Sequence, residues 1–287
     1  EYQRRWDALP PLSKDADWDA KSVYSELQYR LLCKAEAQND WKKVIKLLQK
    51  TATDKNDFLK LCQLCLDHGD IDQADRWLAK AKSLTTGEIS NRYASFNVEY
   101  MEIALLLSQS NYQQALAVQW DIYQQSLAMD DYEKLLELAE MNHSVENFFE
   151  RAEAILLTRI EQNKHRPWFH RYVDDLVELY LREEKYQDSL ALVQQHQVCE
   201  SSILQVAEAF SHEPNIAIPL YAQLADNYVS QSNNSAYHQA VALLLKLISI
   251  AGDVGDKTQA DKIVADFSVR FKAKRNFIKF LNQALAK

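Results

Sequence analysis

The chain has 287 residues, of which 47% are hydrophobic, 4 are glycine and 5 are proline, and its formal net charge is −8. The hydrophobic fraction is ample for a folded core and argues against disorder, and the scarcity of glycine and proline argues against a strand-rich fold with many tight turns. The acidic balance argues against a general nucleic-acid binder, because phosphate contacts require clustered Lys and Arg.

Residues 1–17 contain Pro10-Pro11 and are expected to form an extended lead-in. The chain starts without methionine, so we expect a fragment or a processed product. The start does not resemble a signal peptide, and no apolar run reaches the roughly 18 residues of a membrane span. Four scattered cysteines are too few for a disulfide framework in a chain of this length. These features predict a cytoplasmic protein without a membrane segment.

One pattern recurs along the chain: a large apolar residue opens a predicted helix, and a small residue follows three positions later. Its sharpest copies begin at Tyr112, Phe149 and Tyr186, at steps of 37 residues. Less regular copies begin at Trp41, Ile71 and Tyr237. A recurrence of roughly 20–50 residues is typical of solenoids. We therefore predict an all-α fold of about fourteen helices, in antiparallel hairpins stacked as a right-handed solenoid of tetratricopeptide type.

The predicted array occupies residues 18–229 without a linker, and a C-terminal helical cap over residues 230–287 continues it. Turn chemistry supports the hairpins most clearly at Gly69, which can take the left-handed conformation that ends a helix. Asp70 can cap the following helix, and Gln73 stands where a variant capping box would have its second member.

Cys62 and Cys65 form a CxxC motif, and His68 follows three residues later. A zinc site would need a second such pair, and a redox site would need the motif at a helix start after a strand. Neither context is present, so we predict core cysteines and no metal or cofactor. The chain also lacks a Gly-rich phosphate loop and a nucleophile elbow, so no catalytic residue and no enzymatic activity are predicted.

The segment from His165 to Arg171 is the densest polar-aromatic cluster. In one interpretation it is a binding loop, where Arg166 and Arg171 meet an anion and Trp168 stacks. The favoured interpretation is a helix start, where Trp168 and Phe169 pack on the preceding hairpin.

Charge is unevenly distributed along the chain. Residues 129–161 contain nine acidic and three basic residues, and residues 270–287 contain six basic residues and no acidic one. The favoured interpretation of the basic segment is a capping helix that buries its phenylalanines and solvates its lysines. Alternatively, its cations contact nucleic acid or an acidic partner. The candidate contacts are Arg270, Lys272, Lys274, Arg275 and Lys279.

Two C-terminal stretches resemble the end of bacterial SWIM zinc-finger proteins. Residues 233–247 contain an N-N-x-x-Y-x-x-A helix, and residues 270–281 are similar to a closing R-K-R-N-F-x-K-x-L helix. The middle of the chain, around Ala115–Trp120 and Phe149–Ala152, is similar to the tetratricopeptide-like region of that family. The family's zinc motif pairs C-x-C with a later C-x-H, and this chain has no C-x-C. The resemblance therefore implies the C-terminal interaction region of a larger bacterial cytoplasmic protein, with its metal-binding part N-terminal to Glu1.

These observations predict a non-catalytic scaffold for protein–protein interaction, whose concave face takes a peptide, a helix or a partner domain. The alternative is a nucleic-acid-binding accessory region that acts through the basic C-terminal helices.

Overall fold

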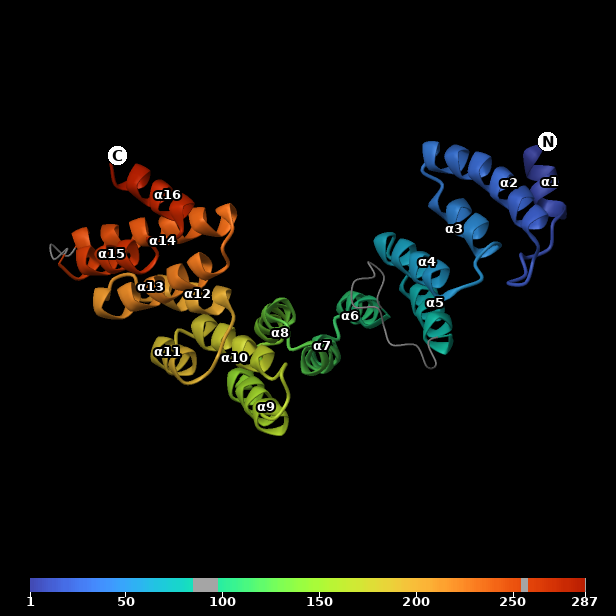
Figure 1. The fold of residues 1–287 in the computed structure, drawn as a ribbon. Helices are drawn as coiled ribbons and strands as arrows, with labels where there is room; N and C mark the ends of the chain where they lie inside the picture. The colour runs from blue at the N-terminus through green and yellow to red at the C-terminus, as the bar shows by residue number, and fades with distance from the viewer. Residues whose placement is uncertain (85–97, 254–257, 287) are drawn as a thin grey trace. The chain divides into compact units, whose positions relative to one another are not determined.

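The computed structural model describes residues 1–84, 98–253 and 258–286, and Figure 1 traces its helices from α1 to α16. Within these ranges the chain forms sixteen α-helices and no strand, so the all-α prediction is confirmed. The chain divides into two compact units, Glu1–Glu146 and Asn147–Lys287. The predicted boundaries after residues 17 and 229 do not coincide with this division and remain predictions about repeat organisation.

The first unit contains eight described helices, and each packs against the next along the chain. Helix α4 also packs against α6. The helices are α1 (Tyr2–Ala8), α2 (Trp18–Ala37), α3 (Trp41–Gln49), α4 (Lys55–Asp67), α5 (Ile71–Ser83), α6 (Val98–Ser108), α7 (Tyr112–Ser126) and α8 (Met129–Met141).

The second unit is built in the same way from α9 to α15, and here α10 also packs against α12 and α14 against α16. Its helices are α9 (Phe148–Asn163), α10 (His170–Arg182), α11 (Tyr186–Gln195), α12 (Glu200–Ala209), α13 (Pro214–Ser230), α14 (Asn234–Asp253), α15 (Thr258–Arg270) and α16 (Arg275–Leu285). In both units, the main packing partners are therefore helices that are adjacent or next but one in the chain.

The recurring sequence pattern coincides with helix starts. Its large residue is the first residue of α3, α5, α7 and α11 and the second residue of α9. Tyr237 differs, because it is the fourth residue of α14. The small residue of the pattern is fully buried at five of six copies, since a larger side chain would hold the packed helices apart. These five residues are Ala74, Ala115, Ala152, Ser189 and Ala240.

A three-residue turn with a left-handed middle residue joins several of the packed helices. The middle residues are Asn39, Gly69, Ser110 and Glu184, with φ between 52° and 73°. The next backbone N–H donates to a carbonyl five residues back, as from Asp70 to Cys65 at 2.8 Å and from Lys185 to Tyr180 at 2.8 Å. This is the hydrogen bond of a Schellman motif, which satisfies carbonyls at a helix end.

Side chains then cap the following helix at three of these turns. The carboxylate of Asp70 accepts the backbone N–H of Gln73 at 3.3 Å and the Gln73 side-chain amide at 2.6 Å. The turn predicted at Gly69 and Asp70 is therefore confirmed. Asp40 and Asn111 cap α3 and α7 in the same position.

The predicted extended lead-in is wrong for its first half, because Tyr2–Ala8 form helix α1. Trp6 is only 3% exposed, and its ring lies edge-on to Tyr24 at 5.8 Å. The hydroxyl of Tyr24 donates to the carbonyl of Pro10. Burial of the indole thus stabilises a helix too short to be stable alone, and Pro10-Pro11 follow the helix.

Helix α14 is long and apolar enough to cross a membrane by length and composition, and among the described helices only α14 meets that test. Tyr237, Leu244 and Leu247 on this helix are nevertheless buried in the core of the second unit, where α14 packs against α13 and α16. This arrangement is that of a core helix.

Candidate functional site

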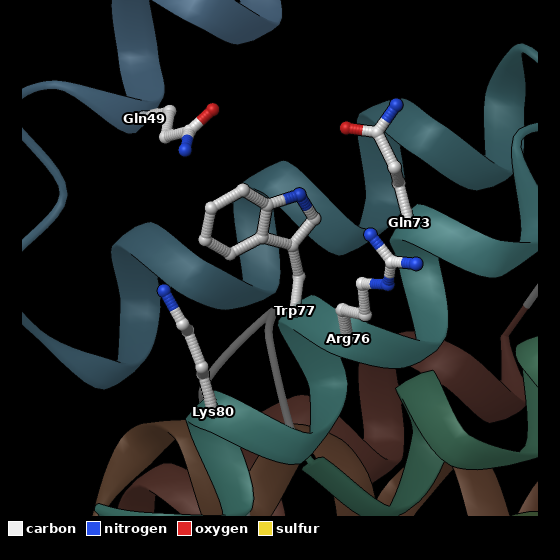
Figure 2. A pocket seen from close by; sticks show the side chains of 5 residues that line it. All are labelled: Gln49, Gln73, Arg76, Trp77 and Lys80. Atoms are coloured by element: carbon white, nitrogen blue, oxygen red, sulfur yellow. The ribbon is translucent and has the colours of Figure 1, made fainter.

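A pocket with a volume of about 200 Å³ opens beside helix α5 in the first unit. One lining residue, Gln49, ends α3, and the other four lie on α5. These four share one face, because they stand at positions i, i+3, i+4 and i+7. They are Gln73, Arg76, Trp77 and Lys80, and Figure 2 shows the two cationic side chains on either side of the indole ring.

Trp77 lines the pocket and is only 6% exposed. Its indole ring stacks nearly parallel to Phe58, with 5.8 Å between the ring centroids and an interplanar angle of 8°. Among the described residues, the buried indole N–H has no hydrogen-bond partner. The indole ring is therefore held in place by its stacking on Phe58.

The polar rim of the pocket consists of two cationic side chains and two side-chain amides, namely Arg76, Lys80, Gln49 and Gln73. The Lys80 Nζ lies 4.8 Å from the Trp77 ring centroid and 5.6 Å from that of Phe58. Arg76 is exposed, and over the described ranges neither cation has a carboxylate within ion-pair distance. The Gln73 amide is fixed by its hydrogen bond to Asp70. The site can thus receive an anionic group, and its described lining residues include no carboxylate, thiol, hydroxyl or imidazole.

A second, wider pocket lies at the turn between α4 and α5. Trp41 and His68 stack in it at 4.8 Å with an interplanar angle of 8°. Lys42 lines it together with Asp70 and Asp72. Because these charges are of both signs, this pocket does not select an ion of either charge.

The CxxC cysteines are buried in helix α4, as predicted. Burial is the main cause that raises the pKa of Cys62 to about 12 and that of Cys65 to about 11. Both thiols therefore stay protonated at neutral pH, which disfavours nucleophilic chemistry at this motif. Among the described residues, no group of three or more His, Cys, Asp and Glu side chains is placed to hold a metal ion.

The predicted basic cluster is partly neutralised by the fold. Arg270 pairs with Asp226 at 2.8 Å and with Asp266 at 3.2 Å, and the Lys274 amine donates to the Ser232 hydroxyl. Asp226 lies 44 residues before Arg270, so this pairing could not be read from local sequence. Three predicted contacts remain exposed without an ion pair in the described part of the chain, namely Lys272, Arg275 and Lys279.

The segment around Trp168 is a turn before α10, which begins at His170. Trp168 is 49% exposed and lies edge-on to Tyr172 at 6.0 Å, and its packing on the preceding hairpin remains a prediction. The Arg166 guanidinium lies 5.3 Å from the Trp168 ring centroid.

Arg171 interacts electrostatically with the half-buried carboxyl of Asp175. Desolvation raises the pKa of Asp175 to about 6 even though the Arg171 charge opposes that rise, and Glu178 and Asp174 add to it. No contact in the described structure joins Arg171 to Arg166 as one anion site.

Comparison of the chain with protein-family models gives no match, and comparison with curated proteins gives no significant similarity.

The α5 pocket was not predicted from the sequence. Its signal was present as Arg76 and Lys80, two cations one helical turn apart that bracket Trp77. That signal could not be separated from an ordinary solvated face, because the contribution of Gln49 from another helix depends on how α4 packs against both α3 and α5.

Proposed function

We propose that this chain is a non-catalytic helical-repeat scaffold for protein–protein interaction. In this proposal its hairpins stack as a right-handed solenoid of tetratricopeptide type, whose concave face takes a peptide or helix. The observation that carries the proposal is the recurring hairpin, in which a left-handed turn, a large helix-opening residue and a buried small residue follow one another. Such repeats serve mainly to build extended binding surfaces.

The packing pattern supports the same conclusion. Helices pack mainly on near neighbours in the chain, so each hairpin needs only the adjoining hairpins to bury its apolar face. The α5 pocket adds a local polar feature suited to a partner's side chains.

We also propose that the chain is related to the C-terminal region of bacterial SWIM zinc-finger proteins, on the likeness of residues 233–247 and 270–281. Its setting would then be the bacterial cytoplasm. A gene whose reading frame encodes a C-x-C and C-x-H motif before Glu1 would support this relation. A complete reading frame without that motif would contradict it.

Affinity capture from a bacterial lysate, with and without nuclease treatment, tests the scaffold function. We expect the full chain to retain a defined protein partner after nuclease treatment, with a stoichiometry that purified components reproduce. Partners that disappear with nuclease would contradict the scaffold function. They would instead favour the nucleic-acid alternative, which would depend on Lys272, Arg275 and Lys279, since Arg270 is paired with acids.

A further inference from the structure

We infer that the α5 pocket binds side-chain carboxylates of an acidic peptide segment in the partner protein. This inference rests on the proposed scaffold function and specifies the chemistry of one contact. The pocket is defined by Gln49, Gln73, Arg76, Trp77 and Lys80.

Charge complementarity is the first argument. Arg76 and Lys80 flank the pocket, and no carboxylate of the described chain lies within ion-pair distance of them. Asp72 lies one turn before Arg76 on α5 without forming such a pair. A guanidinium and an ammonium beside one pocket form charge-assisted hydrogen bonds with a carboxylate, which are roughly twice as strong as neutral ones.

Preorganisation is the second argument. Trp77 is fixed by stacking on Phe58 and by the Lys80 cation beside its ring. Gln73 is fixed by Asp70, which also caps α5. A site whose walls are already ordered loses less conformational entropy when a ligand binds.

The same geometry disfavours nucleic acid as the occupant. Single-stranded nucleic acid is bound mainly through bases stacked on open aromatic faces, but the Trp77 ring is only 6% exposed and is already stacked on Phe58. A pocket of about 200 Å³ suits one or two carboxylate groups.

The test uses the full 287-residue chain and a short fluorescein-labelled oligo-glutamate peptide, with oligo-glutamine of equal length as the neutral control peptide. Anisotropy titrations compare the native chain with the double variant Arg76→Gln/Lys80→Gln. The matched control is Lys21→Gln/Lys60→Gln, which removes two exposed charges from the same unit outside the pocket. All four residues are exposed, so circular dichroism should show unchanged helicity.

We expect the pocket variant to bind oligo-glutamate at least about tenfold more weakly than the native chain, as loss of one charge-assisted contact predicts. The control variant should change affinity by less than about twofold, as for rim charges. Equal weakening in both variants, or equal binding of oligo-glutamine, would overturn the inference. A single-stranded oligonucleotide of equal charge that displaced the peptide more effectively than free peptide would also overturn it.

Failure of this inference is distinguishable from failure of the scaffold function. The capture experiment is repeated with the Arg76→Gln/Lys80→Gln chain as bait. If the partner is retained by this bait, the scaffold function stands and the pocket assignment is wrong. If the partner is lost from this bait but kept by the Lys21→Gln/Lys60→Gln chain, both are supported.

Discussion

Single residues in the hairpin turns take a conformation that their side chains disfavour. Ser110 and Glu184 have φ of 57° and 56°, a region that costs a residue with a Cβ roughly 1–2 kcal/mol. Gly69 fills the equivalent position, and a Cβ added there would meet no atom within 4 Å. The turns therefore differ in local strain although their hydrogen bonds are alike.

Replacing Glu184 with Gly should raise the free energy of unfolding by about 0.5–1 kcal/mol, because relief of strain exceeds the added flexibility of glycine. The matched substitution Gly69→Ala should lower it by about 1 kcal/mol through conformation alone. Urea denaturation measures both changes. The two substitutions should change the free energy of unfolding in opposite directions. Changes in the same direction would contradict the shared turn geometry.

Asp175 should make stability depend on pH. Its pKa is about 6 in the folded chain and 3.8 in the reference state, mainly because of desolvation. A carboxyl with a raised folded pKa favours folding when protonated, so its contribution to stability falls as pH rises through about 4 to 6. Near pH 7, the free energy of unfolding of the Asp175→Asn variant should exceed that of the native chain by about 1–2 kcal/mol, allowing for solvent screening. Near pH 4, the two free energies should differ little. Thermal melts of both proteins at both pH values check this prediction. An equal difference in stability between variant and native chain at the two pH values would contradict it.

At the scale of elements, the helices and several of their starts could be predicted from the sequence. The pattern placed the beginnings of α3, α5, α7 and α11, because a helix start and a buried small residue are local features. The left-handed turns at Asn39, Ser110 and Glu184 could not be predicted, since these residues take that conformation only when the helix packing imposes it. Helix α1 was missed because its stability comes from burying Trp6 against Tyr24.

The candidate site was less predictable than the helices. Arg270 looked like a free cation in sequence, but its partner Asp226 comes from another helix. The α5 pocket likewise combines residues of two helices. Sites of this kind depend on which helix faces meet, and local periodicity does not specify that.

The small position of each hairpin is the element-scale feature most open to test. Ala74→Leu should lower the free energy of unfolding by about 1–3 kcal/mol, because Ala74 is fully buried where helices pack. Ala79→Leu on the same helix is the control, and it should change stability by less than about 0.5 kcal/mol because Ala79 is exposed. Equal effects at both positions would show that the recurring small residue has no packing role.

At the scale of the whole molecule, local packing has a physical consequence. In the proposed repeat organisation, a chain whose helices contact mainly near neighbours gains its stability repeat by repeat. The two compact units each have this organisation. The proposed scaffold function extends it to a solenoid that offers a long surface to a partner.

Small-angle X-ray scattering of the full chain measures whether the helices form the proposed elongated array. A compact globule of 287 residues has a radius of gyration of about 19 Å. The proposed open array predicts a value of about 23 Å or more and an elongated distance distribution in a monodisperse sample. A radius near 19 Å with a symmetric distance distribution would contradict the solenoid and, with it, the extended binding surface.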